Sequence, residues 1–209
     1  MPFQKTLRCI LPTASFAFGL LAQTPNDVKV DTPQARAVVA TLQPHQTNPA
    51  HEHPMNRVLV FLGPGRLTLT SPAGKIEKIA FKAGDVRWSL AGAGNVSENT
   101  TDHPIQIVEI ELKNAPPRPP MPTTKLDPTV VDANHYKVEL ENDQVRVLRV
   151  RYGAHEGGPK HEHILNRVVV NVTDQANGKA GEVHVSGAMT HSEENSLDQP
   201  VERIAVELK

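Results

Sequence analysis

Two pairs of histidines, each with one residue between its members, are the most chemically suggestive feature of this 209-residue chain. They are His51 with His53, and His161 with His163. Residues two apart in a β-strand point to the same face, so each pair would direct two imidazoles into one space. Neutral imidazole suits Zn, Cu, Fe or Ni, and an imidazole from a distant strand would complete one face of a metal site.

A third histidine accompanies only one of these pairs. His191 lies four residues before Asn195, whereas Asn95 takes the equivalent place four residues before Asn99. Asparagine is a poor ligand for transition metals, so we expect one metal-capable site and one degenerate site. The expected metal ligands are His161, His163 and His191. The degenerate first site consists of His51, His53 and Asn95.

An internal repeat makes these positions equivalent. Gln34 aligns with Gln144, an offset of 110 residues. The blocks that match at this offset without a gap are His45 with His155, His51-Glu52-His53 with His161-Glu162-His163, and Asn56-Arg57-Val58 with Asn166-Arg167-Val168. The second copy is shorter, because residues 63–82 correspond to only 174–180. So many matches in the same order indicate a duplicated structural unit.

The elements that must position these histidines read as β-strands. Short apolar runs at 57–61 and 168–172 are typical of buried strands, and 144–152 is rich in β-branched residues. Residues 105–112 alternate in part, and a turn at 71–74 predicts a hairpin between 67–70 and 76–81. No long helical period appears, so the sequence predicts an all-β fold.

A proline-rich segment separates the two copies. Its prolines are Pro116, Pro117, Pro119, Pro120 and Pro122. Such a segment forms an extended, semi-rigid spacer. We therefore predict a first domain at 24–113, a linker at 114–127 and a second domain at 128–209. Each domain is small for an independent core, so we expect the two to pack on each other.

The first 22 residues have the composition of a secretory signal peptide. Lys5 and Arg8 precede a mostly apolar stretch that ends at Ala22. The stretch is too short to span a membrane and is broken by Pro12. We expect signal peptide cleavage after 1–22, a periplasmic or secreted product and no membrane attachment afterwards.

Charge and motifs exclude several function classes. The formal net charge is −1, which favours neither nucleic acid nor an acidic membrane surface. The sequence contains no nucleophilic serine motif, phosphate-binding loop, zinc-finger spacing or nucleic-acid signature. A small-molecule ligand is the partner class that remains.

The motif order resembles that of the cupin superfamily. In each copy an HxH pair is followed by a Gly-Asp-Val or Gly-Glu-Val strand, at 84–86 and 181–183. A residue four positions before an asparagine comes next, and it is Asn95 in the first copy and His191 in the second. This resemblance covers essentially the whole chain after residue 22, twice. It implies two tandem double-stranded β-helix (jelly-roll) barrels packed together, a bicupin. It also implies a divalent transition metal (Zn, Fe, Mn, Cu or Ni) in the second barrel, on the three histidines named above, and a homodimer as one assembly.

One position departs from the cupin pattern. The usual fourth ligand is a glutamate four residues after the second histidine, and here that residue is Arg167, or Arg57 in the first copy. In a regular strand Arg167 points inward and could bind a substrate carboxylate in bidentate fashion. In the alternative, a bend after His163 turns it outward to a surface salt bridge or to the partner barrel. Because both copies keep the arginine and only one keeps three histidines, the outward position is favoured.

His155, with His45 in the first copy, occupies a place where cupins usually have glycine. It would either line the mouth of the barrel, as a substrate-binding residue, or lie in an exposed turn, and the turn is favoured.

Two functions fit these residues. The first is a metal-dependent dioxygenase or related enzyme acting on a small organic substrate. The second is a non-catalytic ligand-binding or structural bicupin with a relic metal site.

Overall fold

The computed structural model describes residues 27–113 and 123–209. The predicted signal peptide at 1–22 and residues 114–122 of the predicted linker lie outside the described residues. The all-β prediction is confirmed, because the described regular structure consists of strands except for one short helix, α1 (Pro128–Val131). None of the described helices is long and apolar enough to cross a membrane.

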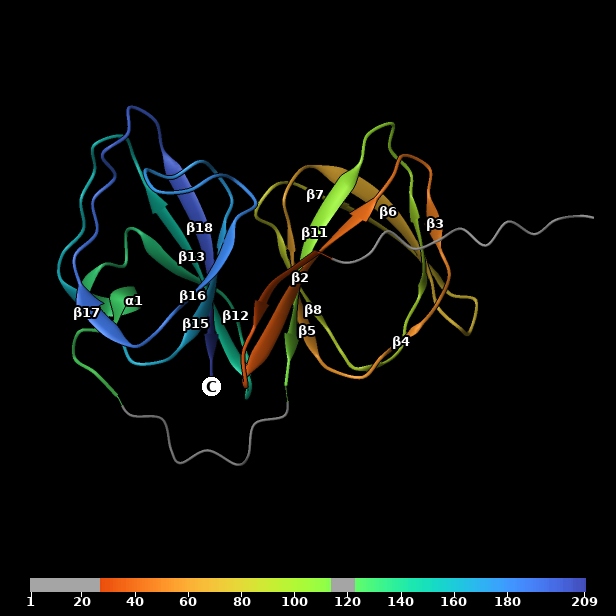
Figure 1. Cartoon of the computed structure of the whole chain (residues 1–209), viewed down its shortest axis with the longest axis horizontal. Helices are drawn as coiled ribbons and strands as arrows, with labels where there is room; N and C mark the ends of the chain where they lie inside the picture. Colours follow the sequence, from red (N-terminus) through yellow and green to blue (C-terminus); the bar gives the residue numbers. More distant parts are fainter. Residues whose placement is uncertain (1–26, 114–122) are drawn as a thin grey trace, which may run out of the picture.

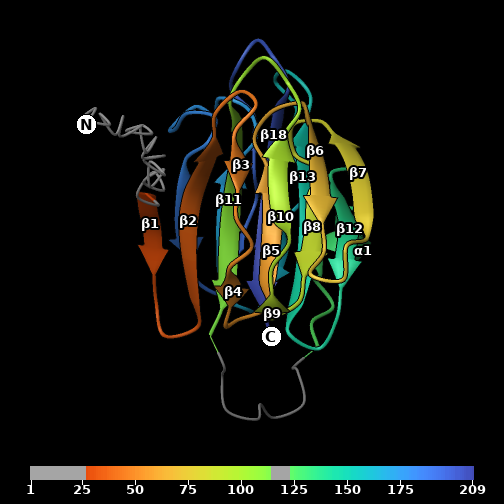
Figure 2. The same ribbon diagram turned by 90° about the vertical axis from the view of Figure 1, so that its right-hand side faces the viewer.

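The first half of the chain forms two larger sheets and a two-stranded ladder (Figure 1). Its strands are β1 (Asp27–Asp31), β2 (Ala35–Leu42), β3 (Thr47–Asn48), β4 (Glu52–His53), β5 (Arg57–Phe61), β6 (Gly65–Thr70), β7 (Ile76–Phe81), β8 (Val86–Ser89), β9 (Gly92–Ala93), β10 (Val96–Asn99) and β11 (Ile105–Leu112). The sheet orders are β1-β2-β11-β5-β8 and β3-β10-β6-β7, with β4 paired to β9. Figure 2 shows the five strands of the first sheet side by side in this order.

The second half repeats the five-stranded arrangement. Its strands are β12 (Tyr136–Glu141), β13 (Val145–Tyr152), β14 (His161–His163), β15 (Arg167–Asn171), β16 (Val183–Ser186), β17 (Met189–His191) and β18 (Val201–Leu208). The order β12-β13-β18-β15-β16 matches β1-β2-β11-β5-β8 strand for strand, and β14 pairs with β17 as β4 pairs with β9. Within the described residues, the hairpin β6–β7 has no counterpart in the second half, in line with the shorter second copy.

The strands predicted from sequence agree closely with those observed. β5 and β11 have the expected bounds, β13 and β15 differ from them by one residue, and the hairpin consists of β6 and β7. The end of the predicted linker is attached to the second half, because the amide of Glu162 donates a 2.8 Å hydrogen bond to the carbonyl of Leu126. Residues 124–126 therefore run beside β14.

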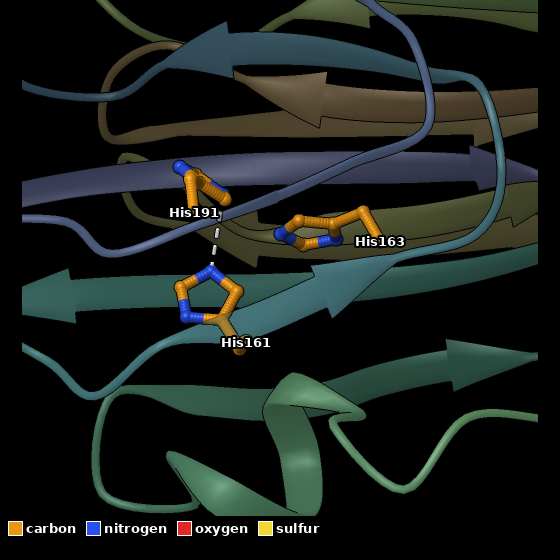
Figure 3. A group of neighbouring side chains, drawn as sticks. All are labelled: His161, His163 and His191. Atoms are coloured by element: carbon orange, nitrogen blue, oxygen red, sulfur yellow. Dashed lines mark hydrogen bonds between the residues drawn. The ribbon is translucent and has the colours of Figure 1, made fainter.

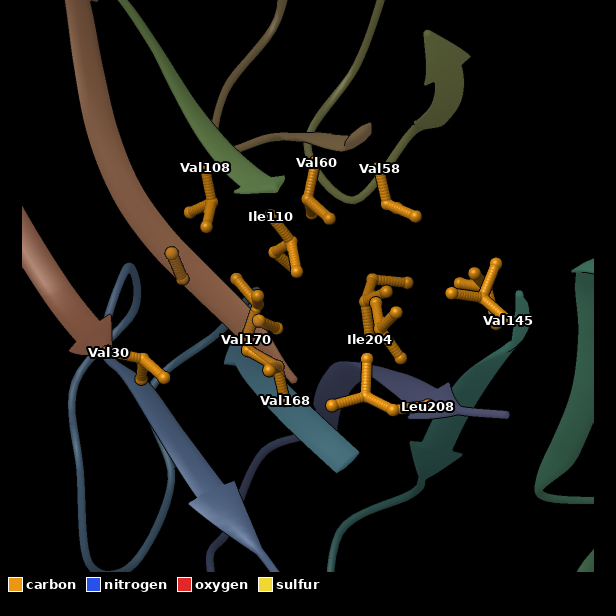
Figure 4. Close-up of a cluster of buried hydrophobic side chains, with 14 of the residues drawn as sticks. Val30, Val58, Val60, Val108, Ile110, Val145, Val168, Val170, Ile204 and Leu208 are labelled. Atoms are coloured by element: carbon orange, nitrogen blue, oxygen red, sulfur yellow. The ribbon is translucent and has the colours of Figure 1, made fainter. Parts of the chain in front are cut away.

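The largest hydrophobic core lies between the two halves (Figure 4). Val58, Val60 and Ile110 of the first half belong to the same buried cluster as Val168 and Val170 of the second. These side chains are fully buried because each sheet covers the apolar face of the other. The shared core gives the two halves a common packing surface.

Equivalent polar contacts frame this shared core. The amide of Asn56 donates to Gln144 at 2.5 Å, and the equivalent amide of Asn166 donates to Gln34 at 2.7 Å. Exchanging the two halves therefore reproduces the same contact, as expected for two similar units that pack face to face about an approximate two-fold axis.

Candidate metal centre

Strand pairing brings the three predicted histidines together. β14 pairs antiparallel with β17, which places His161 directly opposite His191 and His163 opposite Met189. Glu162 lies between the two histidines of β14 and points away from them, since its carboxylate accepts a hydrogen bond from Thr124. Figure 3 shows the imidazoles of His161, His163 and His191 directed toward one another.

The imidazole nitrogens are close enough to share one ion. One ring nitrogen from each histidine lies within 4.8 Å of those of the other two, and the Nε2 atoms of His161 and His191 are 3.1 Å apart. His161 is 0% and His163 2% exposed, while His191 is half-buried. Two ligands on a buried strand and one at the pocket surface leave one side of the cluster open.

Hydrogen bonds from the other ring nitrogens fix the orientation of two histidines. The Nδ1 of His161 lies 3.0 Å from the carbonyl of Pro159, which can only accept a hydrogen bond. The Nδ1 of His163 lies 2.9 Å from the Glu207 carboxylate. Both Nδ1 atoms therefore carry the proton, which leaves each Nε2 atom with the lone pair that a metal ion would need, the arrangement found around histidines that bind metals.

The site also favours the neutral form of two of its histidines, His163 and His191. Burial lowers the pKa of His163, although Glu207 opposes the shift. Burial also lowers the pKa of His191 to about 4. A metal ligand must be neutral imidazole, so these shifts favour the binding form near neutral pH. Convergent nitrogens, fixed tautomers and neutral rings together fit a divalent transition metal ion.

A tyrosine and a glutamate, which the sequence did not single out, complete the surroundings. The hydroxyl of Tyr136 donates to Glu193 at 2.7 Å and lies 3.0 Å from the Nε2 of His161. Arg203 donates to the same glutamate at 2.8 Å. Burial raises the pKa of Glu193, but Arg203 and Tyr136 more than offset it and leave the pKa below its usual value. Only the position of Glu193, two residues after His191, hinted at its role.

Arg167 points inward, so the outward position favoured by the sequence is wrong. Its side chain is buried, with 5% of the residue exposed, and it lines a pocket of about 160 Å³ together with His163 and His191. The guanidinium donates to the carbonyl of Gly187 at 2.7 Å. A bend at Leu165 separates β14 from β15, but it does not turn Arg167 outward, because the side chain lies on the pocket face of β15.

The two equivalent arginines differ in their charge partners. Arg57 donates to Glu109 at 2.8 Å, but the position that corresponds to Glu109 in the second half is Ala205. No carboxylate among the described residues forms a salt bridge with Arg167. The pocket of the second half therefore contains a positive charge without a paired anion.

His155 does not contribute to this pocket. It adopts a left-handed backbone conformation (φ 55°) in an exposed turn, and its Nε2 lies 2.8 Å from Asp198. His45 has the same conformation (φ 56°) in the first half. The turn predicted from sequence fits this geometry, whereas a substrate-binding role for His155 does not, because the residue is absent from the pocket lining.

The first half differs from the sequence alignment at one position. The strand register places Gly94, rather than Asn95, opposite His51, since the Gly94 amide donates to the His51 carbonyl. A Cβ at Gly94 would lie 2.4 Å from that carbonyl oxygen, so no third ligand fits there. Asn95 lies beside the paired position and lines a larger pocket with His51 and His53.

Comparisons with known proteins place the fold. No protein-family model matches the chain, and no curated protein sequence matches it significantly. Three solved structures resemble it at 12% identity. AerE from Microcystis aeruginosa matches over 90% of this chain and 95% of its own (TM-score 0.65). A cupin 2 conserved barrel domain protein from Leptotrichia buccalis matches over 88% of each chain (0.52). A salicylate 1,2-dioxygenase from Pseudaminobacter salicylatoxidans matches over 84% of this chain and 71% of its own (0.56). The chain has the cupin fold.

Proposed function

We propose that the second half binds one divalent transition metal ion through His161, His163 and His191, and that Arg167 binds a small organic acid beside it. The observation that carries this proposal is the convergence of three imidazole nitrogens within 4.8 Å next to an arginine that lacks a carboxylate partner. The ion would be Zn, Fe, Mn, Cu or Ni, since each accepts imidazole ligands.

The proposal extends to the architecture. The matching strand orders of the two halves support two tandem cupin barrels that arose by duplication, with the metal in the second. Export through a signal peptide at 1–22 is a further part of the proposal, and it rests on the composition of those residues. A homodimer, implied by the cupin resemblance, stays a prediction.

The pocket favours a small acid as substrate. It encloses about 160 Å³, below the usual range of roughly 300–1,000 Å³ for drug-sized ligands, so only a compact molecule fits. The Arg167 guanidinium can donate two parallel hydrogen bonds to the two oxygens of one carboxylate. Its pKa is lowered by burial, and an anion beside the guanidinium would offset that cost.

The reaction class that fits best is metal-dependent oxygenation. A bound transition metal would supply Lewis-acid or redox chemistry to an oxygen ligand at its open side. Arg167 would orient the acid, and the buried strands would restrict water. Tyr136, hydrogen-bonded to Glu193, would hold a proton next to the His161 nitrogen. A dioxygenase places both atoms of dioxygen in the organic product and needs no other oxidant.

A non-catalytic ligand-binding protein is the alternative. The observation that favours it is Arg167 itself, because a cation stands where cupins usually have a carboxylate ligand and its charge opposes a metal ion. Both functions require the anion to bind at Arg167, and only the first requires turnover.

Metal-loaded protein incubated with small carboxylic and phenolic acids distinguishes the two. For an enzyme we expect dioxygen uptake equal to product formed, and an Arg167→Gln variant whose KM for the acid rises about 10- to 100-fold, the loss of one charge-assisted contact. Arg57→Gln, at the equivalent place in the first half, is the matched control and should leave KM unchanged. Binding of the acid without dioxygen uptake would favour the non-catalytic ligand-binding protein. Equal affinity for the acid in wild type and Arg167→Gln would contradict both functions.

A further inference from the structure

A cavity larger than the pocket beside the three histidines lies in the first half. It encloses about 400 Å³, compared with about 160 Å³ at the metal centre. This volume lies within the usual range of roughly 300–1,000 Å³ for small-molecule pockets. The two halves therefore offer different spaces to ligands, although their sheets are built alike.

The extra space comes from the hairpin that the second half lacks. Leu67 and Leu69 of β6 and Ile79 of β7 form one wall of the cavity. Leu67 also belongs to a separate buried cluster with Leu42, Phe61 and Ile107, which line the cavity too. The hairpin thus supplies an apolar wall that packs at its edge against the cluster on the five-stranded sheet.

The charged groups around this cavity are largely neutralised. Arg57 pairs with Glu109 at 2.8 Å, Arg87 with Glu77 at 2.8 Å, and Glu111 with Arg36 at 3.0 Å. Glu52, the other charged residue of the lining, is exposed to solvent. An ion that entered the cavity would lose its hydration without gaining an unpaired counter-charge, which is unfavourable.

Hydrogen-bonding groups line the cavity at several places, and three of them lie together at one end. His51, His53 and Asn95 line the cavity from β4 and the segment after β9, which lie together at one end of the half (Figure 2). Burial lowers the pKa of His53 to about 4, with Arg57 and His51 adding to the shift, so the ring is neutral at pH 7. This end offers hydrogen-bond donors and acceptors, and the remaining lining combines the apolar wall of β6 and β7 with polar side chains such as Ser89 and Ser97.

We propose that the first half contains a second, metal-independent binding site for an uncharged small organic molecule that has an apolar body and one hydrogen-bonding group. The apolar body would lie against Leu67, Leu69 and Ile79, and the polar group would face His53 and Asn95. This site would operate separately from the metal centre, whose pocket carries an unpaired arginine and favours an acid.

Trp88 provides a direct reporter, because it is the single tryptophan of the chain and lines this cavity. The probes are 4-propylphenol, which is uncharged at pH 7, and 4-propylbenzoate, which has a similar shape but is an anion. We expect 4-propylphenol to change Trp88 fluorescence saturably, with one molecule bound per chain and at least about tenfold tighter than the benzoate, the cost of an unpaired buried charge. The affinity should be unchanged when EDTA is present.

Two variants of β10 test the location. Ser97 lines the cavity, so Ser97→Phe should fill it and weaken 4-propylphenol binding by about tenfold or more. Glu98 is its exposed neighbour, and Glu98→Phe adds the same ring on the outer face as a matched control. Absence of a saturable response, tighter binding of the benzoate, or equal binding by the two variants would overturn the proposal. The wild-type comparison of probes is decisive even if Ser97→Phe fails to fold.

Discussion

The carboxylate of Glu207 lies 2.9 Å from the Nδ1 of His163, and both side chains are almost completely buried. The other oxygen of Glu207 accepts a 2.6 Å hydrogen bond from Arg146. Burial raises the pKa of Glu207, but His163 and Arg146 more than offset it and keep the carboxyl ionised. One glutamate therefore connects the three-histidine cluster to the five-stranded sheet and sets which nitrogen of His163 faces His161 and His191.

Glu207→Gln should weaken metal binding about 10- to 100-fold, the usual effect of removing the partner of a metal-binding histidine. The amide keeps the shape but loses the charge that fixes the Nδ1 proton. Competition with a chromophoric chelator measures the change. Glu111→Gln, at the equivalent position on β11, is the matched control and should leave metal affinity unaltered. Equal affinity in wild type and Glu207→Gln would show that this contact does not orient the ligand.

The position of Glu207 illustrates what sequence alone could provide. The duplicated blocks and the HxH spacing predicted the strands, the cupin fold and the three histidines that the structure brings together. They did not reveal Glu207 or Tyr136 as neighbours of the site, because Tyr136 lies on β12 and Glu207 on β18, and the contacts of these strands depend on the three-dimensional pairing of β12, β13, β18 and β15.

Two sequence expectations failed for reasons of local backbone geometry. Arg167 was expected to turn outward at a bend, but the bend at Leu165 leaves its side chain buried in the pocket. Asn95 was expected to be the counterpart of His191, but Gly94 takes that place, because the first half has one residue more between the paired position and Asn99 than the second half has between His191 and Asn195. Spacing alone does not reveal such a shift in register.

Arg149→Met should lower the free energy of unfolding by about 3 kcal/mol, because it leaves buried partners unpaired. Arg149 is 6% exposed, donates to Glu139 at 2.6 Å and reaches the Gly84 carbonyl of the first half at 2.8 Å. Urea unfolding measures the loss. Arg151→Met is the control, since Arg151 lies on the same strand with a side chain 56% exposed, and it should cost less than about 1 kcal/mol. Similar losses for both variants would contradict a role of Arg149 between the halves.

Metal-free protein should lose stability as the pH falls from about 6.5 to 4. The pKa of His53 is lowered to about 4 by burial, Arg57 and His51. Below its ordinary value of 6.5, the unfolded chain takes up a proton at this residue and the folded protein does not, so unfolding is favoured. The ring is half-buried, and after discounting for solvent screening we expect about 1 kcal/mol from His53.

Comparison of His53→Gln with wild type isolates that contribution. The variant should lose less stability than wild type between pH 6.5 and 4 when thermal or urea unfolding is measured in EDTA, and the two should run parallel above pH 7. An identical pH dependence in both proteins would mean that His53 titrates normally in the folded state.

The metal content of the purified protein tests the central claim most directly. Elemental analysis after dialysis should find about one transition metal ion per chain in the wild type, as expected for a single three-histidine cluster, and in the Asn95→Ala control. His191→Ala should retain almost none, because two imidazoles alone hold an ion weakly. A wild-type protein with much less than one ion per chain, or a His191→Ala variant with undiminished metal, would contradict a metal centre at His161, His163 and His191.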